Sequence, residues 1–140
     1  MPKTIILAAS LPAAPQKLYD MYLEAKAHAA FTGHAVTIAP RAGAKFSAFG
    51  GMIWGTILHV EPKRQIVQTW RSAHFSKRAI DSVLILSFWP EKGGGRIELV
   101  HVNVDDSDFA GVSDGWQKHY WMPWRAYLEK GAAARKARSK

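Results

Sequence analysis

The sequence contains no cysteine among its 140 residues. This absence excludes disulfide bonds, thiolate nucleophiles and cysteine-ligated zinc sites. The chain also has no run of about 18 to 20 apolar residues, the length that a membrane-spanning helix needs. We therefore expect a soluble protein without a membrane span. Hydrophobic residues make up 48% of the chain and charged residues 21%, a balance typical of a globular domain rather than a disordered chain.

The N-terminus has the outline of a short signal peptide, because Lys3 precedes the apolar residues 5–9. Pro12 interrupts the apolar region, however, and cleavage there would remove what we predict to be the first strand. We therefore interpret residues 3–9 as a strand and place the protein in the cytoplasm.

Basic residues exceed acidic ones, giving a formal net charge of +8. Five of the basic residues lie between positions 130 and 140, a stretch without any acidic residue, so the rest of the chain carries only +3. A basic end of this kind is typical of a solvated terminus. We predict one domain over residues 1–130, a basic, disordered tail over 131–140, and no nucleic-acid partner.

Turn residues and changes of hydrophobic periodicity divide the chain into short elements. We predict a strand over 3–9, helices over 15–23 and 24–30, strands near 36, 46, 53–60, 66–70, 83–89 and 97–104, and a long helix over 109–130. Helical spacing gathers seven apolar residues on one face of the last helix, within which Pro123 is expected to cause a bend. They are Trp116, Tyr120, Trp121, Pro123, Trp124, Tyr127 and Leu128.

This element order predicts an α+β fold. A curved antiparallel sheet of about six to seven strands would grip the long C-terminal helix, with a short helix pair after the first strand. Several segments then resemble one family, the activator-of-heat-shock-ATPase homologues of the START-like, or SRPBCC, superfamily, which has this helix-grip fold. They are Leu11–Pro15 before Leu18-Tyr19, Phe49-Gly50-Gly51 with Gly55, Val60-Glu61-Pro62 before Ile66–Arg71, Leu99-Val100-His101, and Gly115-Trp116 with Tyr120-Trp121, Pro123 and Tyr127-Leu128.

The resemblance implies a hydrophobic cavity between the sheet and the C-terminal helix, which members of the superfamily use for lipids, polyketides, hormones or aromatic substrates. Family members that stimulate the ninety-kilodalton heat-shock chaperone carry an additional N-terminal domain, for which these 140 residues have no room. We therefore expect ligand binding rather than chaperone activation. Phe31-Thr32 stands where relatives are expected to have Trp-Thr, a difference that affects packing near the cavity mouth.

A tight hairpin at Pro62-Lys63 would place His59 opposite Ile66 and Ile57 opposite Gln68 on one side of the sheet. Large aromatic residues would form the cavity walls, and buried polar residues would orient the ligand. The predicted ligand-binding residues are Ile57, His59, Gln68, Trp70, Ile85, His101, Trp116, Tyr120 and Trp124.

Two other hypotheses remain beside a non-enzymatic binding module. The first is a cyclase or hydrolase with His59 or His101 as general base. The second is a chaperone-linked protein that a partner recognises through its basic surface and tail. No histidine spacing predicts a metal site and no motif predicts a cofactor. Both faces of the hairpin over 53–70 are substantially apolar. Either a homodimer covers the second face, or the curled sheet encloses a cavity and packs its remaining surface locally.

Overall fold

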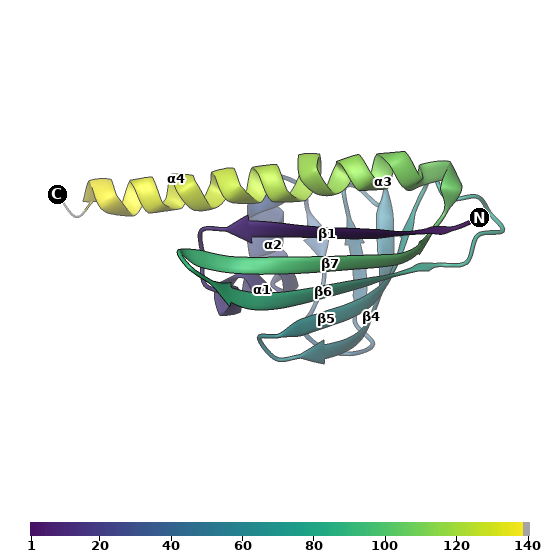
Figure 1. Cartoon of the computed structure of the whole chain (residues 1–140), viewed down its shortest axis with the longest axis horizontal. Coiled ribbons are helices and arrows are strands. Elements are labelled where there is room, and N and C mark those ends of the chain that lie inside the picture. Colours follow the sequence, from purple (N-terminus) through teal and green to yellow (C-terminus); the bar gives the residue numbers. More distant parts are fainter. Residues whose placement is uncertain (139–140) are drawn as a thin grey trace.

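The computed structural model describes residues 1–138, which form one curved sheet, two short helices after its first strand and a long C-terminal helix. Figure 1 shows the C-terminal helix running along the sheet beside the first strand, with the two short helices behind the sheet. The strands are β1 (Lys3–Leu11), β2 (Val36–Thr37), β3 (Lys45–Ala48), β4 (Ile53–Glu61), β5 (Gln65–Ser72), β6 (Ser82–Glu91) and β7 (Gly94–Val104). The helices before the long one are α1 (Pro15–Leu23) and α2 (Ala25–Thr32).

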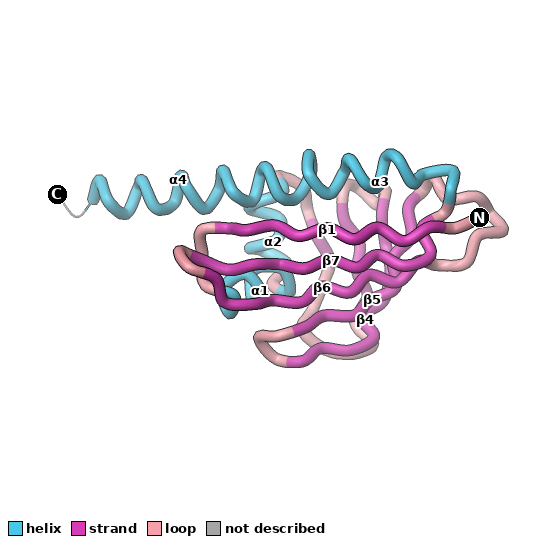
Figure 2. The backbone as a smooth tube through the Cα atoms, in the orientation of Figure 1, coloured by secondary structure: helices cyan, strands magenta, loops and turns pink. Residues whose placement is uncertain are grey.

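All seven strands form one antiparallel sheet in the order β1-β7-β6-β5-β4-β3-β2. The sheet is strongly curved, and β1 at one of its edges lies beside the C-terminal helix (Figure 2). Side chains on its inner face are fully buried, among them Ile66, Leu84 and Leu99. The predicted α+β helix-grip arrangement is confirmed, including the helix pair after the first strand.

The C-terminal helix is continuous but changes its winding in the middle. It comprises a short 3-10 turn η1 (Asp106–Asp108), α3 (Phe109–Gly115), a π-helical segment η2 (Trp116–Trp121) and α4 (Met122–Arg138). Pro123 has no N–H to donate to the carbonyl four residues earlier, and the wider π segment ends just before it. The interruption expected at Pro123 therefore takes the form of a π segment.

The predicted tail begins as a helix, because α4 continues to Arg138. Its last turns extend beyond the strands in Figure 1. Residues 139–140 lie outside the described part of the chain, and the disorder expected of the tail stays a prediction. Basic residues near a helix C-terminus interact favourably with the helix dipole, which accounts for the extension.

The turn between β4 and β5 differs from the predicted hairpin by one residue. Glu61 pairs with Gln65, so the loop has three residues, and Lys63 adopts a positive φ of 64°. Near the turn this shift puts His59 opposite Val67 instead of Ile66. An irregularity between Ile57 and His59 then restores the predicted pairing of Ile57 with Gln68.

The outer face of the sheet keeps several apolar side chains in contact with solvent. Ile6 is 75% exposed, Leu58 48% and Val102 37%. The homodimer that would cover this face stays a prediction. Within the described residues, none of the helices combines the length and the apolar character needed to cross a bilayer.

Candidate ligand-binding pocket

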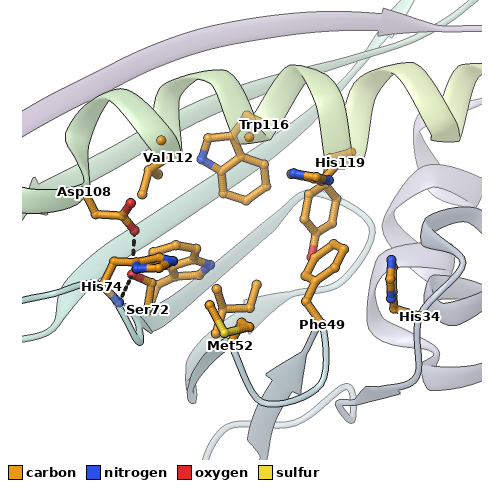
Figure 3. A pocket seen from close by; sticks show the side chains of 14 residues that line it. His34, Phe49, Met52, Ser72, His74, Asp108, Val112, Trp116 and His119 are labelled. Carbon is orange, nitrogen blue, oxygen red and sulfur yellow. Dashed lines mark hydrogen bonds between the residues drawn. The ribbon is translucent and has the colours of Figure 1, made fainter.

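A pocket of about 410 Å³ lies between the first half of the C-terminal helix and one end of the sheet. Figure 3 shows Val112 and Trp116 on the helix side and Met52 and Phe49 on the opposite side. Its residues come from the helix, from strands β4 and β5, and from three loops. They are His34, Phe49, Met52, Ile53, Trp70, Ser72, His74, Asp108, Gly111, Val112, Gly115, Trp116, His119 and Tyr120.

One end of the pocket is closed by a cluster of aromatic rings around Phe49. The centroid of this ring lies 5.0 Å from that of His34, 5.6 Å from His119 and 5.9 Å from Tyr120. Phe49 has a positive φ of 54°, a backbone conformation that costs a non-glycine residue about 1 kcal/mol. The surrounding rings hold Phe49 in this conformation at the closed end of the pocket.

The other end of the pocket is polar. The Ser72 hydroxyl donates to Oδ2 of Asp108 at 2.5 Å and accepts from the backbone N–H of His74 at 3.1 Å (Figure 3). The sequence predicts that the acidic residues at 105–108 cap the last helix, but neither Asp105 nor Asp108 makes a side-chain cap hydrogen bond. Both carboxylates instead accept hydrogen bonds from residues at 72–76 and so tie the β5–β6 loop to the helix.

His101 is a buried support behind the tryptophans of the pocket. Its Nδ1 accepts from the indole N–H of Trp116 at 3.3 Å, and its Nε2 lies 2.8 Å from the Ser82 hydroxyl. That hydroxyl donates to the carbonyl of Trp70, so Nε2 of His101 carries the proton. Burial lowers the pKa of His101 to about 3, which keeps the ring neutral. With both ring nitrogens engaged, His101 positions Trp116 rather than facing a ligand.

A second buried polar chain joins the helix pair to the C-terminal helix. His28 Nδ1 lies 2.8 Å from the carbonyl of Tyr22, and its Nε2 lies 2.9 Å from the Tyr120 hydroxyl. The carbonyl can only accept, so Nδ1 donates and Nε2 accepts from Tyr120. Burial lowers the pKa of His28 to about 4 and raises that of Tyr120. The Tyr22 hydroxyl in turn donates to Oε1 of Gln68 at 2.6 Å.

His28 is not among the residues predicted from the sequence, although its spacing to Phe31 places both on the apolar face of α2. His28 stacks on Phe31, with ring centroids 5.1 Å apart, and Phe31 stacks on Trp124 at 4.1 Å. Trp124 is only 1% exposed and belongs to this core. The structure therefore places Trp124 in the packing beside α2 and not in the pocket.

Of the nine predicted ligand-binding residues, three line the pocket: Trp70, Trp116 and Tyr120. Ile57 and Gln68 are fully buried in the core, outside the pocket lining. Two other residues lie away from the pocket. The side chain of His59 is 59% exposed and pairs with Glu61 at 3.8 Å, and Ile85 lies on the outer face of β6 between the inward-facing Leu84 and Leu86.

The pocket residues supplied by loops are also absent from the predicted set. Phe49, His34 and His74 fall in turn segments, where no periodicity assigns a side chain to a face. The Gly50-Gly51 pair beside Phe49 is the one sequence signal for a special turn there.

The arrangement favours apolar binding over acid–base chemistry at the two histidines proposed from the sequence. His59 is at the surface and His101 is fully engaged, so neither is placed to take a proton from a pocket ligand. Three other histidines and Asp108 reach the pocket, but within the described residues no three metal-ligating side chains converge. Within the described residues, the buried indole N–H of Trp70 also has no hydrogen-bond partner.

Several known proteins are similar to this chain in sequence or in structure. A protein from Dictyostelium discoideum, named activator of 90 kDa heat shock protein ATPase homolog, is 30% identical over 117 residues, which are 84% of this chain and 30% of that protein. The crystal structure of an HSP90 activator from Plasmodium falciparum is similar with a TM-score of 0.80 and 17% identity, over 90% of this chain and 96% of that one. A protein structure from Mesorhizobium loti has a TM-score of 0.77 and 19% identity, over 91% and 98% of the two chains.

These structures share the curved sheet and long C-terminal helix, and at their level of identity they establish the fold. This chain spans 30% of the length of its Dictyostelium relative, so the activity of that whole protein does not transfer with the match. The sequence model described as "Activator of Hsp90 ATPase homolog 1-like protein" matches residues 12–129. The match covers most of the chain and agrees with the resemblance carried by its motifs, and the chain belongs to the Activator of Hsp90 ATPase homolog 1-like family.

Proposed function

We propose that the protein binds a small hydrophobic or aromatic molecule in the pocket between its sheet and its C-terminal helix. The observation that carries this proposal is the pocket itself, whose volume of about 410 Å³ lies in the range of about 300 to 1,000 Å³ typical of small-molecule sites. Aromatic side chains from the helix, β5 and the Phe49 turn line it together. Such a surface favours flat apolar molecules, which displace water from it on binding.

One feature of the surroundings supports a binding role. Trp70 lines the pocket, and its indole N–H has no partner within the described residues, as is also true of Trp121 and Trp124 outside the pocket lining. A ligand with a hydrogen-bond acceptor within reach of Trp70 would satisfy its N–H, whose burial alone is costly.

Isothermal titration calorimetry with 2-naphthylmethanol tests the proposal. This uncharged probe combines a flat aromatic body with one hydroxyl. We expect Trp116→Leu to weaken its binding at least about tenfold, because the variant removes an aromatic wall of the pocket. The matched control is Trp54→Leu, which removes a tryptophan that is 40% exposed and lies outside the pocket, and its affinity should equal that of the parent protein.

A second variant protects the test against misfolding, because Trp116 is part of the core. Met52 lines the pocket but is 42% exposed, so Met52→Trp fills space at the pocket without changing the interior. This substitution should weaken the binding of 2-naphthylmethanol as well. Equal affinity in the parent protein, Trp116→Leu and Met52→Trp, or no binding at all, would show that the pocket is not the site.

A chaperone-linked function is the second candidate. Membership of the family and the 30% identity to a named activator of the 90 kDa heat shock protein ATPase favour it. The helix that extends beyond the sheet is basic, with Lys130 and Arg135 among its residues, and it offers a surface for an acidic partner (Figure 1).

Truncation after Lys130 separates the two candidates. If the chaperone is bound through the basic helix, the truncated protein should lose binding to the purified 90 kDa chaperone in a surface plasmon resonance experiment. Its affinity for 2-naphthylmethanol should not change, since the pocket lies at the other end of the C-terminal helix. Chaperone binding that survives the truncation would rule out recognition through this segment.

A further inference from the structure

The charge of the pocket is the starting point for a narrower inference, which rests on the proposed function. With histidine counted as neutral, Asp108 is the only one of the 14 lining residues that carries a formal charge. Among the residues that the structure describes, no lysine or arginine lines the pocket. The net positive charge of the chain therefore does not extend to its pocket, whose single charge is negative.

Asp108 is fixed in place without being neutralised. The Ser72 hydroxyl holds Oδ2, while Oδ1 rests against Gly111, where an added Cβ would come within 2.7 Å of it. Within the described residues no cationic side chain forms a salt bridge with Asp108. The hydroxyl orients the carboxylate and leaves its charge and one oxygen available.

The aromatic walls of the pocket favour a positively charged ligand, as Asp108 does. Trp70, Trp116 and Tyr120 line the pocket, and the face of an aromatic ring carries negative electrostatic potential. Aromatic rings around a site attract organic cations, and a carboxylate at one end adds direct ion pairing. A carboxylate-bearing ligand would meet repulsion from Asp108 without any compensating lysine or arginine in the described lining.

We propose that the ligand is a hydrophobic ammonium compound, whose nitrogen pairs with the carboxylate of Asp108 and whose apolar body lies along Trp70 and Trp116. Figure 3 shows the arrangement that this binding mode needs: Asp108 and Ser72 lie at one end, and Trp116 lies between them and the Phe49 cluster. The anionic end of a fatty acid or an aromatic acid is disfavoured in this pocket.

Three probes with one ring system test the inference by calorimetry at pH 7: 2-naphthylmethylamine, which is an ammonium ion at this pH, 2-naphthylmethanol, which is neutral, and 2-naphthoate, which is an anion. The ammonium should bind at least about tenfold more tightly than the anion, the size expected for one partly buried charge pair. The neutral compound should fall between them.

Asp108→Asn is the decisive variant, because its amide oxygen still accepts from Ser72 while the charge is gone. It should abolish the preference for the ammonium over the anion, a ratio that is measured within the one variant. Gly111→Ala should reduce the preference too, since its new Cβ would displace the carboxylate. An anion that binds as tightly as the ammonium, or a preference that persists in Asp108→Asn, would overturn the inference.

The outcomes also distinguish this inference from the proposed function. If the binding of 2-naphthylmethanol depends on Trp116 but the three probes bind with equal affinity, the pocket is a ligand site and only the ammonium assignment fails. If none of the three probes binds, both fail.

Discussion

Acidification from pH 7 to pH 5 is expected to remove about 4 kcal/mol from the free energy of unfolding, because two buried histidines must stay neutral in the folded protein. Burial lowers the pKa of His28 to about 4 and of His101 to about 3. In the unfolded chain both return to about 6.5, so that state binds more protons as the pH falls. The stability that they contribute is complete above pH 6.5 and decreases toward the folded-state pKa values.

Urea unfolding followed by circular dichroism at pH 7, 6 and 5 measures this loss. Most carboxylates titrate below pH 5, so the histidines dominate the change in the free energy of unfolding between pH 7 and pH 5. An NMR titration provides an independent readout, in which the imidazole resonances of His28 and His101 should not move between pH 7 and 5. Titration of either histidine near pH 6.5 would contradict the neutral, hydrogen-bonded state described for it.

Gly55→Ala is expected to destabilise the fold by about 3 kcal/mol or more, the upper range for overpacked positions. A Cβ at Gly55 would lie 1.9 Å from the backbone oxygen of Thr69 and 2.6 Å from its carbonyl carbon. Backbone atoms in the middle of a sheet cannot rotate away as a side chain does, so β4 and β5 would have to separate. The melting temperature should fall by about 10 °C.

Gly131→Ala is the matched control for that measurement. Gly131 lies in the exposed part of α4, where the nearest atom to an added Cβ is an Arg135 side-chain nitrogen at 3.6 Å. Alanine has a higher helix propensity than glycine, so this variant should melt at or slightly above the temperature of the parent protein. Equal melting temperatures for Gly55→Ala and the parent protein would show that the close approach of β4 to Thr69 is not rigid.

The hydrophobic patterns were sufficient to predict the sheet and the order of its elements. The apolar run over residues 83–89 and the three- and four-residue spacing in 109–130 reflect burial that secondary structure imposes directly. The family motifs supported the same arrangement. Trp70, Trp116 and Tyr120 could be assigned to the interior for the same reason, although the sequence did not show which interior residues border an empty volume.

The π segment explains one error on the C-terminal helix. A regular helix would turn Tyr127 toward the sheet with Trp116, but a π turn adds a residue and rotates the later part of the helix relative to the earlier part. Trp121, Trp124 and Leu128 are therefore buried while Tyr127 is 43% exposed. The sequence signal for this change was Pro123, which predicts an interruption but not its geometry.

The error at His59 has a different cause. A three-residue turn replaces the predicted two-residue turn, and a shift by one residue exchanges the faces of a strand. The later irregularity returns Ile57 to the inner face, so only the residues nearest the turn are misplaced. Turn length depends on backbone conformations such as the positive φ of Lys63, which the residue type does not reveal.

The measurement that tests the central claim most directly is a titration of the protein with 2-naphthylmethanol, followed through the indole N–H signals of its six tryptophans in ¹H–¹⁵N correlation spectra. If the ligand enters the pocket, the signals of Trp70 and Trp116 shift on binding, while those of the exposed Trp54 and Trp89 stay in place. Shifts confined to Trp54 and Trp89, or no shifts at saturating probe, would contradict a ligand site between the sheet and the C-terminal helix.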